Sequence, residues 1–344
     1  MTNSVASPER EKGITPAEWL LRAWVLATRY KFSCFLDDES AQLPHGIPST
    51  VARRVSDELI VNSTFRYQTG SELPDEIQPL GLPMHGCLKG FPLAWILDPR
   101  ASVWMPFWAR GEYAEALAAL RPGQVPPPGF KAEVTKRLAA AEILVPPEHE
   151  TACRASREAF LESARPAFHS AGYLIVRDMI HPMQLGALRR HYQAMLAGGS
   201  VPKGDWIERR YGLHSELMAT FLHLQLRDLV SQIAGERVKP SFVYLGIYGE
   251  SAELPRHTDR PQCEFNISLQ IDYRPEPHGP TGWPLYLENP GRPEAAVAAD
   301  LGLGDAVFYR GREVAHYRHP LRDGHQATLL FLNYVREDFT GRLW

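Results

Sequence analysis

The sequence predicts an α+β protein in which a mainly helical N-terminal region precedes an antiparallel β-sandwich or jelly roll. Up to about residue 140, apolar side chains recur at helical spacing in several segments, whereas short β-rich runs joined by Gly- and Pro-rich turns dominate after Lys239-Pro240. The Pro-rich segment 145–148 lies between these parts. We therefore expect a first domain over 1–145, of unknown role, and a second over 150–344.

Helix signals are clearest near the N-terminus. Thr15, Pro16 and Glu18 supply an N-cap, a proline at the first helical position and a capping-box partner, so a helix is expected from there to about Tyr30. Ser215 is also expected to cap a helix. The other helices are expected over 50–67, 112–121, 131–143, 182–196 and 215–234.

Strand signals begin with a short β-rich run at 172–177 and continue after residue 240. Within 264–273, apolar and polar residues alternate completely, which gives one apolar face that ends with Tyr273 and one polar face that includes Asn266 and Ser268. That polar face is expected to line a cavity or to contact solvent. The remaining strands are expected over 242–248, 283–287, 306–309, 314–318 and 327–335.

The charge of the chain gives no reason to expect a polyanionic partner. Its formal net charge is -3, so neither nucleic acid nor an anionic membrane surface is expected to bind through general electrostatics. The first residues are polar and charged, unlike a secretory signal, and the early apolar stretch at 19–30 is too short to span a bilayer. A cytoplasmic location is therefore expected.

Two histidines and an aspartate form a candidate metal site. His257 and Asp259 lie two positions apart and directly before the strand at 264–273, so on extended chain both side chains point to one face. His316 follows the turn and strand that begin at Gly304, where the chain is expected to return across the sheet. Two imidazoles and one carboxylate can cover one face of a six-coordinate metal, which is the ligand set expected of a non-haem Fe(II) oxygenase. The alternative, a turn cap, a solvated carboxylate and a core histidine, needs three independent coincidences.

The order of these motifs resembles the Fe(II)/2-oxoglutarate-dependent dioxygenase superfamily, near its prolyl-4-hydroxylase-like branch. The resemblance covers roughly 160–335. The motifs that carry it are Leu254-Pro255-Arg256-His257-Thr258-Asp259, the alternating strand, Gly304-Asp305, His316-Tyr317-Arg318 and Gly324.

The resemblance implies a double-stranded β-helix in which His257, Asp259 and His316 bind Fe(II) and act in catalysis. It further implies 2-oxoglutarate as cosubstrate, which chelates the metal and leaves as succinate and carbon dioxide. Halogenases of that family replace the acidic ligand with a small residue, so the presence of Asp259 favours a hydroxylase.

The residue that binds the far carboxylate of 2-oxoglutarate departs from the family pattern. The common pattern has an arginine ten positions after the distal histidine, where this chain has Gln326. Arg318 is the favoured substitute, because on a continuing strand it points to the same face as His316 at about 7 Å, comparable with the length of the cosubstrate. Arg322 is the second candidate, and Tyr248 is a candidate to hydrogen-bond the cosubstrate, although ordinary core packing explains Tyr248 equally well.

Other histidine and arginine positions are weaker candidates than the triad. His214-Ser215-Glu216 has ligand-like spacing but is better explained as a helix start. His319 and His325 lie close to His316 in sequence, but the resemblance selects His316, which follows the Gly304-Asp305 unit. A polar-aromatic group that could contact substrate is expected in a solvated loop. It comprises Trp206, Arg209, Arg210 and Tyr211.

The sequence thus favours an Fe(II)- and 2-oxoglutarate-dependent hydroxylase. Its expected partner is a small-molecule, peptide or protein substrate, with an amino-acid side chain suggested by analogy with the family. The alternative function is a jelly-roll binding or structural protein with a structural or vestigial metal site, which Gln326 keeps open. The sequence leaves the oligomeric state open.

Overall fold

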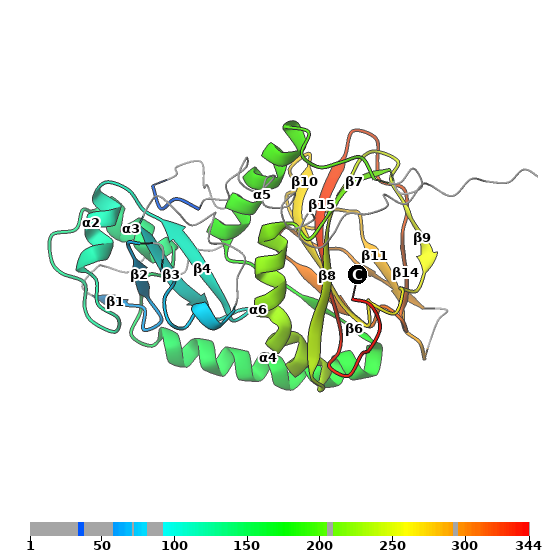
Figure 1. Ribbon diagram of the computed structural model, residues 1–344, viewed down its shortest axis with the longest axis horizontal. Helices are drawn as coiled ribbons and strands as arrows, with labels where there is room; N and C mark the ends of the chain where they lie inside the picture. The colour runs from blue at the N-terminus through cyan, green and yellow to red at the C-terminus, as the bar shows by residue number, and fades with distance from the viewer. Residues whose placement is uncertain are drawn as a thin grey trace, which may run out of the picture.

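Two antiparallel sheets face each other and form a jelly roll in the computed structural model, which describes residues 34–37, 58–70, 72–80, 92–204, 209–291 and 295–343 (Figure 1). The larger sheet, called here the major sheet, has six strands and the smaller, the minor sheet, has four. In order across the major sheet the strands are β6 (Tyr173–Val176), β13 (Ala306–Tyr309), β10 (Phe265–Arg274), β15 (Gln326–Arg336), β8 (Val238–Tyr248) and β7 (Arg210–His214). Across the minor sheet they are β12 (Ala296–Ala299), β11 (Leu285–Glu288), β14 (Ala315–Arg318) and β9 (Leu254–His257).

The strands predicted after residue 240 are all present, and the two sheets of the jelly roll contain three further strands that were not predicted. These are β7, β9 and β12. Most of them are short or edge strands, whose residues alternate only weakly between apolar and polar, so periodicity gives little signal for them. The chain from Arg209 to Tyr211, expected in a solvated loop, instead leads into β7 at the edge of the major sheet.

A register shift in β10 corrects the predicted faces of that strand. Its pairing with β15 is irregular between Gln270 and Asp272. Before the shift, Ile267 and Leu269 pack in the core under the helices, and after it Tyr273 packs between the two sheets instead. A bulge adds one residue to the strand, so side chains beyond it change faces.

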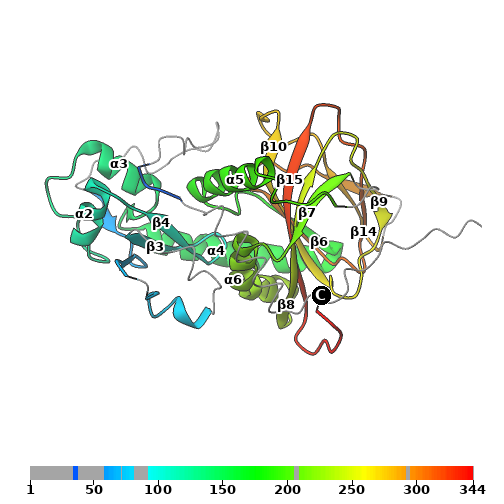
Figure 2. The same ribbon diagram turned by 45° about the horizontal axis from the view of Figure 1, so that its top comes forward.

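Three helices cover the major sheet on the side of the N-terminal strands: α4 (His149–Ala171), α5 (Pro182–Ala197) and α6 (Leu217–Ala234). Helices α5 and α6 lie between the major sheet and the N-terminal strands, and α4 runs beside both (Figures 1 and 2). The N-cap of α6 lies one residue later than predicted. Ser215 has a positive φ of 48°, and the side chain of Glu216 accepts the hydrogen bond from the Ala219 amide at 2.9 Å. Glu216 is therefore the N-cap and the prediction for Ser215 was wrong.

The described part of the N-terminal region mixes strands and helices and is not mainly helical. The predicted helices at 112–121 and 131–143 are confirmed as α2 (Glu112–Ala119) and α3 (Ala132–Ala140), whereas the end of the helix predicted over 50–67 is extended chain. The expected helix at 15–30 lies outside the described residues. The strands of this region are β1 (Ile60–Val61), β2 (Arg66–Gln68), β3 (Leu93–Asp98), β4 (Val103–Trp108) and β5 (Leu144–Val145).

The β3–β4 hairpin explains this difference. Both strands are short apolar runs, which periodicity alone does not distinguish from buried helix, and pairing with each other satisfies their backbone groups. β2 adds to the free edge of β3. Tertiary pairing thus decides the secondary structure here.

One hydrophobic cluster joins the N-terminal region to the jelly roll. It contains Trp95 and Phe107 of the hairpin, Phe221 of α6 and Leu245 of β8. The boundary predicted at 145–150 falls between β5 and α4. Because the core is continuous across it, the division into two domains stays a prediction. Among the described helices, none is long and apolar enough to cross a membrane.

We predict that Gln225→Ala lowers the free energy of unfolding by about 1–3 kcal/mol, because it leaves the partly buried amide of Trp104 unpaired. The Gln225 side chain on α6 accepts a hydrogen bond from the Trp104 amide of β4 at 2.7 Å. Urea unfolding followed by tryptophan fluorescence measures the change. Gln232→Ala on the same helix is the control and is expected to cost less, since its contact to Arg157 is long, at 3.4 Å. Equal costs would show that the β4–α6 contact adds no stability.

Candidate metal and cosubstrate site

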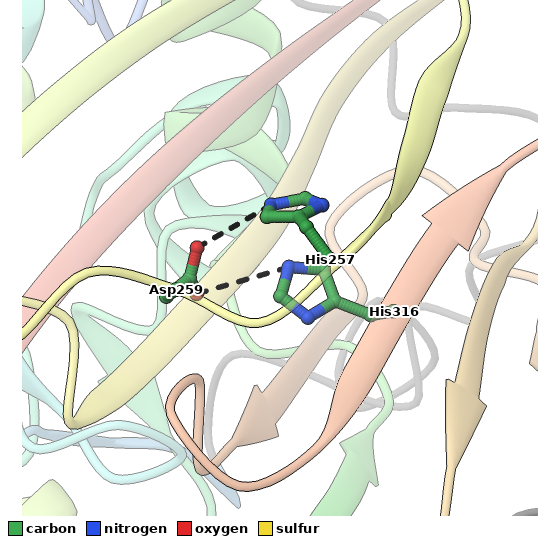
Figure 3. Close-up of side chains that lie close together, drawn as sticks. All are labelled: His257, Asp259 and His316. Atoms are coloured by element: carbon green, nitrogen blue, oxygen red, sulfur yellow. Dashed lines mark ion pairs between the residues drawn. The ribbon is translucent and has the colours of Figure 1, made fainter.

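The three predicted ligands converge in one place, where their side chains point toward one another (Figure 3). β9 ends at His257 and β14 pairs with it, so that His316 lies directly opposite His257. Asp259 follows two residues after the strand. Its carboxylate lies 3.5 Å from Nε2 of His257 and 3.7 Å from Nε2 of His316. One ligand atom from each residue lies within 4.8 Å of the other two, so one ion can contact all three.

Both imidazoles are oriented by the backbone. Nδ1 of His257 donates to the carbonyl of Pro255 at 2.7 Å, and Nδ1 of His316 donates to that of Val314 at 2.9 Å. A proton on Nδ1 leaves the lone pair on Nε2, which is the nitrogen that points toward Asp259. The same backbone contact two residues upstream thus prepares both rings as metal ligands.

The carboxylate of Asp259 is positioned by a glycine that the sequence motifs do not single out. The Asp259 amide donates to the carbonyl of Gly311 at 2.7 Å, and Asn266 donates to Oδ2 of Asp259. A Cβ on Gly311 would lie only 2.3 Å from that Oδ2 and equally close to the Asn266 side chain. The only signal in the sequence is a glycine in the tight turn between the strands 306–309 and 314–318.

The site combines a buried wall with an open side. The side chain of His316 is 2% exposed, whereas those of Asp259 and His257 are 18% and 38% exposed. Burial lowers the pKa of His316, and the nearby Asp259 carboxylate opposes that shift. A neutral imidazole is the form that binds a metal, so burial favours ligation.

Arg318 is a buried cation with unused hydrogen-bonding capacity. It shares the inward face of β14 with His316, its guanidinium lies 4.5 Å from the centre of the Trp283 ring, and Nη1 donates to the carbonyl of Trp283. Nη2 is buried and has no hydrogen-bond partner among the residues that the structure describes. Burial lowers the pKa of Arg318 to about 10, so it stays charged at neutral pH. A buried charge without a counter-ion is costly unless a ligand supplies one.

The other two predicted cosubstrate residues differ in their surroundings. Tyr248 is buried, its ring packs 5.2 Å from that of Trp283, and its hydroxyl accepts a hydrogen bond from Arg210 at 3.0 Å. Arg322 lies exposed in the loop between β14 and β15. Gln326 begins β15.

Polar side chains of β10 line the interior between the sheets. Asn266, Ser268 and Gln270 are buried. Within the described part of the chain, Oδ1 of Asn266, Oγ of Ser268 and Oε1 of Gln270 have no hydrogen-bond partner. The face of β10 that the sequence left between cavity and solvent is therefore enclosed. Buried polar atoms without partners are rare in proteins and indicate a place for water or a ligand.

The remaining histidine candidates do not join the triad. His214 packs against Phe242 and Tyr244, and Glu216 caps α6. His325 contacts the Tyr273 hydroxyl at 2.9 Å, and His319 lies beyond β14 beside two tyrosines. Trp206 lies outside the described residues.

Comparison with known proteins gives similarity in structure alone. No family model and no curated protein matches the sequence. A prolyl-4-hydroxylase from Pseudomonas putida is 16% identical, with 52% of this chain and 99% of that chain covered at a TM-score of 0.42. A prolyl hydroxylase from Trichoplax adhaerens, solved with a hypoxia-inducible factor peptide, is 12% identical, with coverage of 54% and 94% and a TM-score of 0.45. SnoN, a non-haem α-ketoglutarate-dependent epimerase of nogalamycin biosynthesis, is 15% identical, with coverage of 52% and 84% and a TM-score of 0.43.

We predict that Gly311→Ala weakens metal binding by at least tenfold without unfolding the protein, because the new methyl group displaces the Asp259 carboxylate. Calorimetric titration with Mn(II) measures the affinity, and circular dichroism checks the fold. Gly279→Ala is the matched control, since a Cβ at that position would have no atom within 4 Å. Unchanged Mn(II) affinity in Gly311→Ala would show that Asp259 is not a ligand.

Proposed function

We propose that the chain is a non-haem Fe(II)- and 2-oxoglutarate-dependent oxygenase that hydroxylates an unactivated C–H bond. The observation that carries this proposal is the convergence of two backbone-oriented imidazoles and one carboxylate around a point open to solvent. Two nitrogen ligands and one carboxylate are the set that holds Fe(II) in such enzymes and leaves positions for other ligands.

A closed structural site fits this geometry less well. Structural zinc sites have four protein ligands, and among the residues that the structure describes this cluster has three. Gln326 is the feature that favours the alternative, a jelly-roll protein with a structural or vestigial site. The unpartnered Nη2 of Arg318 counts against it, because it supplies the cation that Gln326 does not.

Each residue of the site has a distinct part in the proposed reaction. His257, Asp259 and His316 would hold the metal, and Arg318 would bind the far carboxylate of 2-oxoglutarate through a charge-assisted hydrogen bond. Fe(II) and 2-oxoglutarate bound at these residues would provide the oxidising chemistry. The substrate would be oxidised while 2-oxoglutarate is converted into succinate and carbon dioxide. Tyr248, next to Trp283, can donate its hydroxyl proton to the same carboxylate while it accepts from Arg210.

The outcome and the substrate are proposals by analogy. Asp259 occupies the position where a small residue would leave room for halide, which favours hydroxylation. We propose an amino-acid, peptide or protein substrate, in line with the resemblance to prolyl hydroxylases, and we assign substrate recognition in part to the N-terminal region.

We predict that the purified protein forms succinate from 2-oxoglutarate only when Fe(II) and oxygen are both present. His257→Ala is expected to reduce this at least a hundredfold by removing a ligand, whereas His319→Ala, on a histidine outside the site, is expected to retain it. Succinate is measured by mass spectrometry. Binding of metal and consumption of oxygen without succinate would indicate an iron oxygenase that does not use 2-oxoglutarate.

We predict that Arg318→Met weakens 2-oxoglutarate binding by about tenfold to a hundredfold, the range expected for hydrogen bonds between charged groups. Arg322→Met is the matched control and is expected to stay within about twofold, because Arg322 is exposed. Calorimetric titration of the Mn(II)-loaded variants measures both. The reverse pattern would assign the carboxylate to Arg322.

A further inference from the structure

The inward face of the major sheet continues past the triad to the edge strand β7. The register places Asn266 of β10 beside Asn333 of β15, and the Asn333 side chain donates to the carbonyl of Phe242 on β8. One step along, Tyr244 of β8 pairs with His214 of β7. A continuous surface therefore connects the residue that holds Asp259 with the edge of the sheet.

Two facing glycines shape this surface. Gly212 of β7 pairs with Gly246 of β8, and the Tyr244 hydroxyl lies where a Cβ on Gly212 would be, at 1.6 Å from its position. The missing side chains let the Tyr244 ring lie flat toward β7. They also let the guanidinium of Arg210 lie 4.7 Å from the centre of that ring.

Two arginines and a histidine pack against aromatic rings along this surface, which we call the β7–β8 strip. The Arg260 guanidinium lies 4.3 Å from the centre of the Phe242 ring, and the His214 ring lies 4.7 Å from that of Tyr244. Arg260 directly follows Asp259 in the chain, so the strip borders the metal site. Its members are Arg210, His214, Phe242, Tyr244 and Arg260.

Arg260 differs from the arginines around it. Arg256 pairs with Glu288 and Arg312 with Glu264. Arg260 is exposed and, within the described part of the chain, no carboxylate lies within ion-pair distance of its guanidinium. The Arg260 side chain packs against Phe242 and hydrogen-bonds Cys263. A guanidinium has five N–H donors, so donors remain for the two oxygens of a carboxylate.

We propose that the β7–β8 strip binds a carboxylate group of the substrate, with Arg260 as the main contact. This proposal rests on the proposed function only where it identifies the bound molecule as the substrate. The charge and geometry of the strip do not depend on the proposed function. A carboxylate held by Arg260 places the rest of the substrate beside Asp259, at the exposed side of the triad. Arg210 adds positive charge along the same surface. Burial, together with the charges of Arg260 and Arg210, lowers the pKa of His214 to about 4, so its ring is neutral at neutral pH.

The test compares two probes of equal size, 3-phenylpropionate and 3-phenylpropanamide, in ligand-observed NMR titrations of the full chain. The protein is loaded with Mn(II) and saturated with 2-oxoglutarate, so that the cosubstrate site is filled, and the titrations are repeated on the metal-free protein. The expected result is at least tenfold tighter binding of the carboxylate than of the amide, weakened by added salt.

Arg260→Gln is expected to remove this preference, Arg260→Lys to retain part of it, and Arg256→Gln, a neighbouring arginine with the same change in charge, to leave it unchanged. Thermal unfolding of each variant checks the fold. Equal affinity for the two probes, or a preference that survives in Arg260→Gln, would overturn the proposal. If the probe carboxylate binds at Arg260 but the protein does not bind 2-oxoglutarate, carboxylate binding by the β7–β8 strip is supported and the proposed 2-oxoglutarate-dependent activity is refuted.

Discussion

The pairing of β9 with β14 is the constraint on which the site depends. It places His316 opposite His257 although 58 residues of chain separate them, and it holds both rings over the same carboxylate. The turn at Gly311 then supports Asp259 from the side, through a contact too close for any side chain. Three candidate ligands from two strands and one loop are thereby positioned by backbone hydrogen bonds, and little depends on the flexibility of the side chains.

The second constraint is a polar interior closed on most sides by apolar core. Burial of Arg318 between the sheets costs free energy that its contacts with Trp283 offset only in part. On β10, Ser268 and Gln270 add buried oxygen atoms that have no hydrogen-bond partner in the described ranges. An anionic ligand between the sheets would pair with the Arg318 guanidinium, and a bound molecule there could also donate hydrogen bonds to these oxygen atoms. Ligand binding would therefore explain why the space between the sheets is lined by polar side chains.

The triad and most of the strands were predictable because they follow local rules. Spacing of two predicted that His257 lies near Asp259 and that His316 shares a face with Arg318. His257 and Asp259 are close together, although Asp259 lies beyond the end of β9, and His316 and Arg318 are both buried on β14. What escaped prediction depends on tertiary contacts. The bulge that turns Tyr273 inward, the glycine at 311, the cap moved from Ser215 to Glu216 and the β3–β4 hairpin are each decided by a partner distant in sequence or by a single dihedral angle.

The most direct test of the account is a crystal structure of the protein with Fe(II) and 2-oxoglutarate, grown without oxygen. We expect that Nε2 of His257, Nε2 of His316 and one oxygen of Asp259 bind the metal, and that the far carboxylate of the cosubstrate contacts Nη2 of Arg318. A fourth protein ligand that closes the metal site, or a cosubstrate carboxylate bound away from Arg318, would contradict it.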